Sequence, residues 1–178
     1  MSSFRLCLFC GLVAIAAGLM VTSFIGPWWT ANITHKIIGF VAAIQIYPYG
    51  IPLTEAGSQY WAADITPFYQ TVLSWIYLGV SVGLILYSTR LKGRKGRWLL
   101  GGIGLSYIAY AAIAVIWVAT RTGDFGISLQ GYSSIVQAEG EADVYAGLQF
   151  GYYLAYAVGV ICVGLAIAHD RITGIKLK

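Results

Sequence analysis

Charged residues are scarce in this chain, and their scarcity argues against a water-soluble domain. Of 178 residues only 10% are Asp, Glu, Lys or Arg, whereas 58% are hydrophobic and the mean hydropathy is +0.74. A soluble domain carries about 25% charged and about 45–50% apolar residues. The net charge of +4 comes from 11 basic and 7 acidic residues, too small a surplus to predict nucleic-acid binding. We therefore expect membrane lipids, and no nucleic acid, as partners of the chain.

Cysteine and histidine are also rare, which limits disulfide and metal chemistry. The three cysteines, Cys7, Cys10 and Cys162, all lie inside apolar runs, and the chain has only two histidines. A structural zinc site needs about four ligands of these kinds. No phosphate-binding glycine motif and no recognisable pair of nucleophile and base occurs either. We expect neither a metal, a cofactor nor catalytic activity.

Four apolar stretches are long enough to cross a membrane, which takes about 20 residues. They are residues 4–25, 67–88, 98–119 and 144–168, and none contains Asp, Glu, Lys or His. Charge-coupled transport normally needs such a residue inside the bilayer. Between the stretches lie an outer segment (26–66), a basic turn (89–97) and an outer loop (120–143), and a tail (169–178) follows. The fold class predicted is a single integral membrane domain, mainly α, with a four-helix bundle.

The distribution of basic residues predicts the orientation. One side of the proposed membrane holds nine of the eleven basic residues, Arg5, Arg90, Lys92, Arg94, Lys95, Arg97, Arg171, Lys176 and Lys178. Cytoplasmic loops carry the excess of Lys and Arg in membrane proteins. We expect a multi-pass protein of the cell membrane with both termini cytoplasmic and with segments 26–66 and 120–143 extracellular.

The basic turn allows two interpretations. It holds Arg90, Lys92, Arg94, Lys95 and Arg97. These residues serve as a topology signal alone, or they also bind anionic lipid headgroups, to which each basic residue near the surface contributes about 1 kcal/mol.

Small residues recur at a spacing of four in two of the apolar stretches. The fourth stretch has Gly147, Gly151, Ala155 and Gly159, and the second has Gly79 and Gly83. Small residues let membrane helices approach closely. They serve packing within one bundle or contacts between identical chains, and the sequence leaves both open.

Both outer segments contain runs that favour strands. Residues 29–35, 37–47 and 125–137 are rich in β-branched and aromatic residues, and Pro48 and Gly50 follow the second run. We predict a small extracellular β-sheet formed by the two outer loops.

The layout of the whole chain resembles that of a known family. It combines four apolar stretches, both termini on one side, a longer first outer segment and the strand entry Pro27-Trp28-Trp29 directly after the first stretch. This layout is similar to the claudin and peripheral myelin protein superfamily of tetraspan proteins, whose first-strand tryptophan corresponds to Trp28 or Trp29. The Gly-Leu-Trp signature and the cysteine pair of claudins are absent from residues 26–66. The resemblance implies the architecture but not tight-junction activity.

The outer loops offer two candidate sites. Glu139, Glu141 and Asp143 alternate just before the fourth apolar stretch. They attract a hard cation such as calcium, or they are solvated acids that favour the start of a helix. Asn32-Ile33-Thr34 is a glycosylation acceptor, so Asn32 is a candidate for modification.

Two functions fit these observations. The first is a non-catalytic, claudin-like tetraspan protein that acts through lateral helix packing and extracellular-sheet contacts, with itself or other integral membrane proteins as partners. The second is an accessory subunit of a larger membrane enzyme, such as a respiratory or monooxygenase complex. A pore is a third interpretation, since one line of polar residues runs along the second stretch at Gln70, Ser74, Tyr77 and Ser81.

Overall fold

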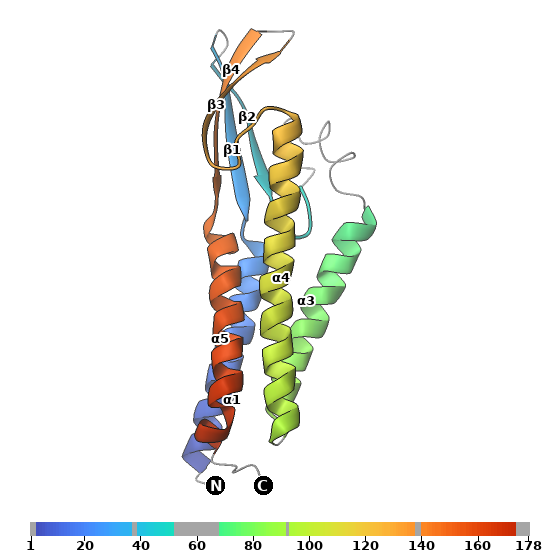
Figure 1. The fold of residues 1–178 in the computed structure, drawn as a ribbon, viewed down its shortest axis with the longest axis vertical. Helices are drawn as coiled ribbons and strands as arrows, with labels where there is room; N and C mark the ends of the chain where they lie inside the picture. Colours follow the sequence, from blue (N-terminus) through green and yellow to red (C-terminus); the bar gives the residue numbers. More distant parts are fainter. Residues whose placement is uncertain (1–2, 37–38, 52–67, 92, 138–139, 174–178) are drawn as a thin grey trace. The chain divides into compact units, whose positions relative to one another are not determined.

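The computed structural model describes residues 3–36, 39–51, 68–91, 93–137 and 140–173 (Figure 1). In chain order the elements are α1 (Ser3–Ile25), β1 (Trp29–His35), β2 (Gly39–Ile46), α3 (Phe68–Ser88), α4 (Arg94–Asp124), β3 (Gly131–Gln137), β4 (Gly140–Leu148) and α5 (Phe150–Thr173). Among the described residues, four helices are long and apolar enough to cross a membrane. This confirms the prediction of a mainly helical protein with four such helices and a small antiparallel sheet.

The chain divides into two compact units. One comprises Met1–Ser23, Ile76–Ala111 and Leu154–Lys178, and we call it the helical unit. The other comprises Phe24–Trp75 and Ala112–Tyr153, and we call it the sheet unit. The division falls inside the helices, so each of α1, α3, α4 and α5 contributes residues to both units.

The sheet has four antiparallel strands in the order β2-β1-β4-β3. It consists of two hairpins, β1–β2 and β3–β4, which are joined by pairing between β1 and β4. The strand predicted at residues 29–35 is confirmed as β1. Of the second predicted strand, 37–47, the sheet contains Gly39–Ile46 as β2, and Ile37 and Ile38 lie outside the described residues.

The third predicted strand, residues 125–137, begins too early. Only Gly131–Gln137 is a strand, because α4 continues to Asp124 and then ends in a tight cap. Gly126 has φ of +70°, its N–H bonds to the carbonyl of Gly123, and the N–H of Ile127 bonds to the carbonyl of Thr122. This is a Schellman cap, which needs a residue that adopts positive φ. α4 spans Arg94–Asp124, so the helix extends beyond both ends of the predicted span 98–119 and into the first residues of the predicted loop 120–143.

The fourth predicted stretch, 144–168, also begins too early. Residues 144–148 belong to strand β4, and α5 begins at Phe150. Val144 is apolar because its side chain lies in the core of the sheet unit, not because it faces lipid. Hydropathy does not separate a short buried strand from the first turns of an apolar helix.

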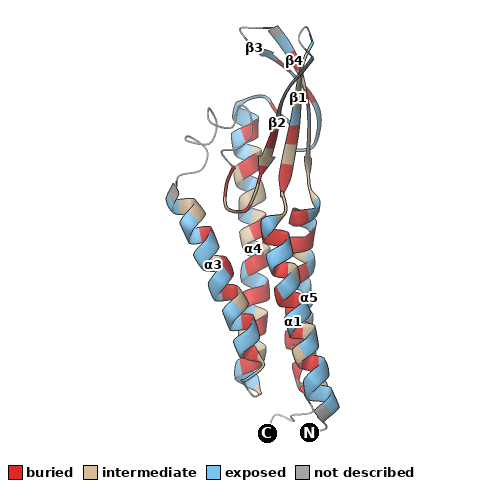
Figure 2. Cartoon of the chain, turned by 180° about the vertical axis from the view of Figure 1, so that it is seen from behind, coloured by how far each residue is buried: buried red, intermediate tan, exposed pale blue. Residues whose placement is uncertain are grey.

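The core of the sheet unit covers one face of the sheet. It holds Trp29, Ala31, Ile44, Ile46, Ile51, Val118, Ile127, Ile135, Ala142 and Val144. These residues come from all four strands, from the end of α4 and from two connecting segments. Buried positions alternate with exposed ones along β3 and β4, as expected when only one face of a sheet is covered (Figure 2). The second face is left for other contacts.

The helical unit is held together by contacts across all four helices. Gly104 of α4 and Gly159 of α5 lie where the two backbones approach, because a Cβ on Gly104 would lie 2.7 Å from the carbonyl oxygen of Gly159. Tyr107 of α4 donates to the Ser23 hydroxyl of α1 at 3.2 Å. The hydroxyls of Tyr77 on α3 and Ser106 on α4 are 2.9 Å apart.

Candidate functional site

The uncovered face of the sheet carries a network of charged and hydroxyl side chains. Lys36 follows β1, and its Nζ lies 2.6 Å from Oε1 of Glu141 and 3.8 Å from Oδ1 of Asp143, both on β4. From β3, the Ser134 hydroxyl donates to Oε1 of Glu141 at 2.7 Å and the Tyr132 hydroxyl donates to Oδ1 of Asp143 at 2.6 Å. The period of two along β4 puts both carboxylates on one face, where a single lysine reaches both.

This geometry changes the interpretation of the acidic segment. Glu141 and Asp143 are strand residues paired with Lys36, not solvated acids ahead of a helix, and Glu139 lies outside the described residues. Among the described residues, no three His, Cys, Asp or Glu side chains gather as a metal site would need. One carboxylate oxygen of Glu141 and one of Asp143 are engaged by an ammonium group and two hydroxyls, and the cation site stays a prediction.

The ion pair shifts the pKa of both partners in the directions that favour charge. The hydrogen bond from Lys36, followed by that from Ser134, lowers the pKa of Glu141 from 4.5. The hydrogen bond to Glu141 raises the pKa of Lys36 from 10.5, against a smaller opposing effect of burial. The stability that ionised Glu141 gives to the folded sheet is fully present above pH 4.5. It is lost as the pH falls through the pKa of Glu141 in the folded protein. The stability that protonated Lys36 gives to the folded sheet is fully present below pH 10.5. It is lost as the pH rises through the pKa of Lys36 in the folded protein. The ion pair therefore stabilises the sheet between these two pH limits.

Replacing Lys36 tests this account. We expect Lys36→Met to bring the pKa of Glu141 back toward 4.5, because the largest cause of its lowering is removed. Carboxyl carbon chemical shifts of labelled glutamate, followed through a pH titration, measure it. Arg121→Gln is the control and leaves the Glu141 titration unchanged. A Glu141 that already titrates at 4.5 in the unmodified protein would contradict the ion pair.

Two exposed tyrosines stand beside this network. Tyr132 and Tyr145 are register partners on β3 and β4, and their ring centroids are 5.2 Å apart. Asn32 of β1 is the register partner of Tyr145 on its other side and is also exposed. A row of Asn32, Tyr145 and Tyr132 therefore crosses three strands. A glycan at Asn32, which stays a prediction, would lie directly beside Tyr145.

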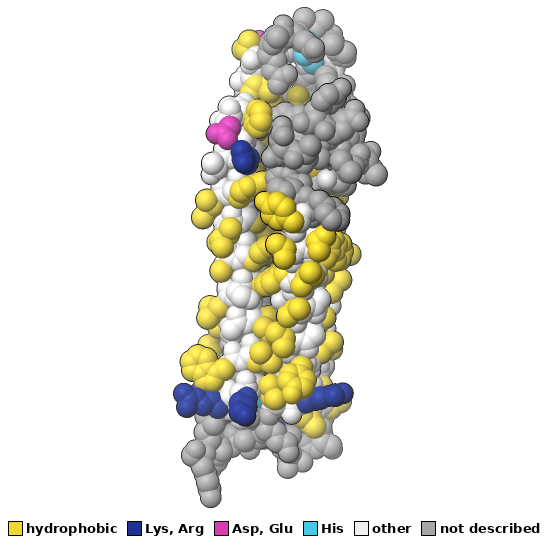
Figure 3. Space-filling view, turned by 90° about the vertical axis from the view of Figure 1, so that its right-hand side faces the viewer, with side chains coloured by type: hydrophobic (Ala, Val, Ile, Leu, Met, Phe, Trp, Pro, Cys, Tyr) yellow, Lys and Arg dark blue, Asp and Glu magenta, His cyan; other side chains and the backbone are white. Residues whose placement is uncertain are grey.

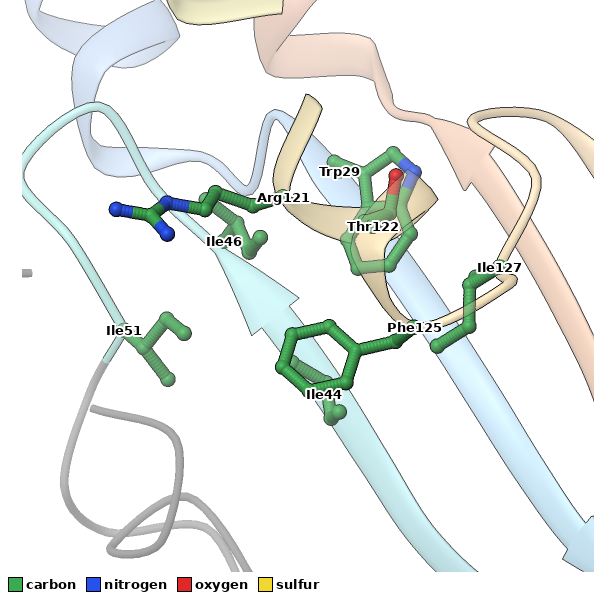
Figure 4. Close-up of a pocket in the computed structure, with 8 residues that line it drawn as sticks. All are labelled: Trp29, Ile44, Ile46, Ile51, Arg121, Thr122, Phe125 and Ile127. Atoms are coloured by element: carbon green, nitrogen blue, oxygen red, sulfur yellow. The ribbon is translucent and has the colours of Figure 1, made fainter. Parts of the chain in front are cut away.

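The covered face of the sheet contains a small cavity rather than a ligand pocket. It measures about 20 Å³, and its walls are apolar (Figure 4). It is lined by Trp29, Ile44, Ile46, Ile51, Arg121, Thr122, Phe125 and Ile127. A water needs at least about 10–15 Å³ together with two to four polar partners. The cavity is a packing gap in the core of the sheet unit.

The basic turn is partly helical. Arg94, Lys95 and Arg97 lie in the first turn of α4, Arg90 follows the end of α3, and Lys92 lies outside the described residues. Arg97 donates from Nη1 to Oδ2 of Asp170 on α5 at 3.3 Å. Lys and Arg side chains gather at one level of the helical unit, next to a long hydrophobic surface (Figure 3).

His169 is a site residue that the sequence analysis missed. It is buried on α5, its Nδ1 lies 3.1 Å from Oδ1 of Asp170, and Phe9 packs edge-on against its ring. Its Nε2 has no hydrogen-bond partner within the described structure, and a Cβ on Gly96 would lie 3.2 Å from it. His169 therefore orients Asp170, which in turn holds Arg97. The only sequence signal was a His-Asp pair just beyond an apolar run.

The predicted small-residue positions divide into three groups. Gly147 is in strand β4, so its assignment to a helix stripe is wrong, because α5 starts after it. Ala155 is buried, and Gly151 and Gly159 each lie against neighbouring segments in their own units. Gly79 and Gly83 of α3 are exposed, and a Cβ on either would meet no atom within 4 Å. The α5 residues serve internal packing, whereas the α3 pair does not.

The polar line on α3 is engaged by neighbouring segments. Ser74 donates to the carbonyl of Pro48 at 3.2 Å, Tyr77 bonds to Ser106, and Ser81 is buried. These contacts give the polar residues a packing role. The cysteines form no disulfide, and Cys162 is buried beside Gly104.

Comparisons with known proteins identify no relative: no protein-family model matches the chain, and no curated protein matches it.

Proposed function

We propose that the chain is a non-catalytic membrane protein that acts by contact, binding another membrane protein through the uncovered face of its sheet. The observation that carries this proposal is the row formed by Asn32, Tyr145 and Tyr132 beside the Lys36 network. Tyrosines are enriched at protein interfaces because a large, stiff ring adds contact area at little entropic cost. The Tyr132 hydroxyl already donates to Asp143 at 2.6 Å, so this side chain would lose little further conformational entropy when a partner binds.

The proposed setting is the cell membrane, with four spanning helices. Large apolar side chains are exposed on every helix of the helical unit, among them Ile15, Val80, Leu105 and Val160. A soluble monomer rarely exposes so continuous an apolar surface, whereas lipid would cover it. The excess of basic residues supports cytoplasmic termini and an extracellular sheet. The resemblance to the claudin superfamily stays a prediction.

Lateral contact through α3 is part of the same proposal. Gly79 and Gly83 are exposed, and a Cβ added to either would meet no atom of a neighbouring segment within 4 Å. In lipid, such a pair of glycines lets a second helix approach closely. The stripe on α5 is already occupied by internal packing, so α3 is the helix that we expect to meet a partner.

Replacing Tyr145 tests the sheet contact. We expect Tyr145→Ser to lower the amount of partner recovered with the full chain from mild detergent about thirtyfold, because losing an interface hot spot costs about 2 kcal/mol or more. Quantitative mass spectrometry of the purified complex measures the recovery. Tyr153→Ser on α5 is the matched control, since Tyr153 is 53% exposed and Tyr145 is 60% exposed. Equal recovery with both variants would contradict a role for the sheet face.

The identity of what is recovered decides between the two functions. A differently tagged copy of the chain, or one non-catalytic membrane protein, supports the contact function. Redox-active subunits recovered in fixed proportion would instead make the chain an accessory subunit of a membrane enzyme. An Asn32 found fully glycosylated would place a bulky group on the proposed contact face and would argue against contact through Tyr145.

A further inference from the structure

A groove runs between α4 and α5 in the helical unit. It encloses about 310 Å³ and is lined by Arg97, Trp98, Gly101, Val163, Ala166 and Ile167. A Cβ on Gly101 would lie 3.5 Å from that of Ala166, so α4 and α5 approach closely at two small residues that line the groove. Small-molecule pockets typically measure about 300–1,000 Å³. The groove therefore has room for an elongated apolar ligand or part of one.

The groove is polar at one end and apolar along the rest. On α4, Arg94, Arg97 and Gly101 follow one another at helical spacing and share a face. On α5, Asp170 pairs with Arg97, and Ala166 lies opposite Gly101 one turn further along. The ion pair thus marks one end, and the small and branched apolar residues extend away from it. This is the arrangement that an amphiphile requires.

The polar end is positively charged. The described residues of the helical unit hold one acid, Asp170, and six basic residues, Arg5, Arg90, Arg94, Lys95, Arg97 and Arg171. Arg94, Lys95 and Arg97 also occupy the first turn of α4, where free N–H groups and the helix dipole favour an anion. Asp170 accepts one N–H of the Arg97 guanidinium, which has five, so Arg97 retains donors for a second acceptor.

We propose that this groove binds one anionic phospholipid, with its phosphate at Arg94, Lys95 and Arg97 and an acyl chain along Gly101 and Val163. Trp98, exposed at the rim, would lie at headgroup level, as interfacial indole rings do. His169 and Asp170 act as positioning residues for Arg97. The inference rests on the proposed membrane placement of the helices and uses no residue of the sheet unit.

The headgroup arm of the test compares two lipids. The full chain in mild detergent is titrated with phosphatidylglycerol or with phosphatidylcholine of identical acyl chains, and native mass spectrometry counts bound lipid. We expect tighter binding of phosphatidylglycerol. Arg94→Gln/Lys95→Gln, which keeps the Arg97–Asp170 pair, should weaken that binding about thirtyfold, since each basic residue contributes about fivefold. Equal affinity for the two lipids would overturn the proposal.

Variants of residues that line the groove distinguish a lipid bound in the groove from a lipid attracted only to the charged surface. Gly101→Leu fills the groove, and Ile167→Ser removes one apolar wall from an exposed position, so the second variant leaves the helix packing intact. We expect each to weaken phosphatidylglycerol binding about tenfold. Gly79→Leu, on an exposed glycine outside the groove, is the matched control and should not change it. Unchanged binding in Ile167→Ser would show headgroup attraction without the groove and would overturn the proposal.

Lipid binding by the groove and partner recovery through the sheet are measured separately, so either can fail without the other. Tyr145→Ser should bind phosphatidylglycerol like the unmodified chain, whatever it does to partner recovery. A chain recovered from cells in the soluble fraction would refute the membrane placement, and with it this inference, before any lipid is added.

Discussion

Gly104→Ala is expected to lower the free energy of unfolding by about 1–3 kcal/mol, the usual cost of adding volume to a packed interior. A Cβ at this position would lie 2.7 Å from the carbonyl oxygen of Gly159 and 2.9 Å from Cβ of Cys162. Neither atom is the end of a flexible side chain, so α4 and α5 would have to separate. In the reverse direction, a Cβ on Gly159 would lie 3.0 Å from the carbonyl oxygen of Gly104. Reversible unfolding in mixed detergent micelles, followed by circular dichroism, measures the loss.

Gly102→Ala is the matched control for that substitution. It lies on the same helix, and a Cβ there would meet no atom within 4 Å. Alanine favours a helix over glycine by about 0.5–1 kcal/mol, so Gly102→Ala is expected to be neutral or slightly stabilising. If Gly104→Ala were as stable as Gly102→Ala, the close approach of α4 and α5 would be wrong.

Trp29→Ala is expected to lower the free energy of unfolding of the sheet unit by about 3–5 kcal/mol, the range found for large aromatic residues in cores. Trp29 is 2% exposed, lies in the core of the sheet unit, and donates from Nε1 to the carbonyl of Leu129 at 2.7 Å. The substitution removes the largest side chain of that core and leaves a carbonyl without its donor. Hydrogen exchange of peptides from β1 and β4, read by mass spectrometry, reports the loss locally.

Two further variants separate the causes of that effect. Trp29→Phe keeps most of the packing but loses the donor to Leu129, so we expect an intermediate loss of about 1–3 kcal/mol. Trp98→Ala alters a tryptophan that is 64% exposed, and its effect should stay within about 0.5 kcal/mol. Equal protection of β1 and β4 in Trp29→Ala and Trp98→Ala would rule out Trp29 as a core residue of the sheet.

Long apolar stretches and strand patterning predicted four helices and the strand at residues 29–35 correctly, because both signals depend on neighbouring residues. The start of the last helix was predicted wrongly, because Val144 is as apolar in a buried strand as it would be in lipid. Strand β4 was therefore missed, and Gly147 was placed on a helix. Local pattern carries no information about which surface an apolar residue covers.

The candidate site depended on contacts that no local pattern contains. Glu141 and Asp143 were recognised as neighbours, but their partner Lys36 is brought to them by pairing between β1 and β4. The sequence treated the glycines of the second and fourth stretches alike, and only the structure separates packed Gly159 from exposed Gly79 and Gly83. His169 was passed over because a histidine outside an apolar run gives no sign that it is buried.

The pairing of β1 with β4 sets an order for assembly during synthesis. Trp29 pairs with Leu148, and all of α3 and α4 lies between them in the chain. When the first hairpin emerges, one edge of β1 has no neighbour until the last strand has been made. Contacts between such distant segments form slowly, and an open strand edge meanwhile invites pairing with other chains. That edge of β1 therefore stays open for as long as it takes to synthesise two helices.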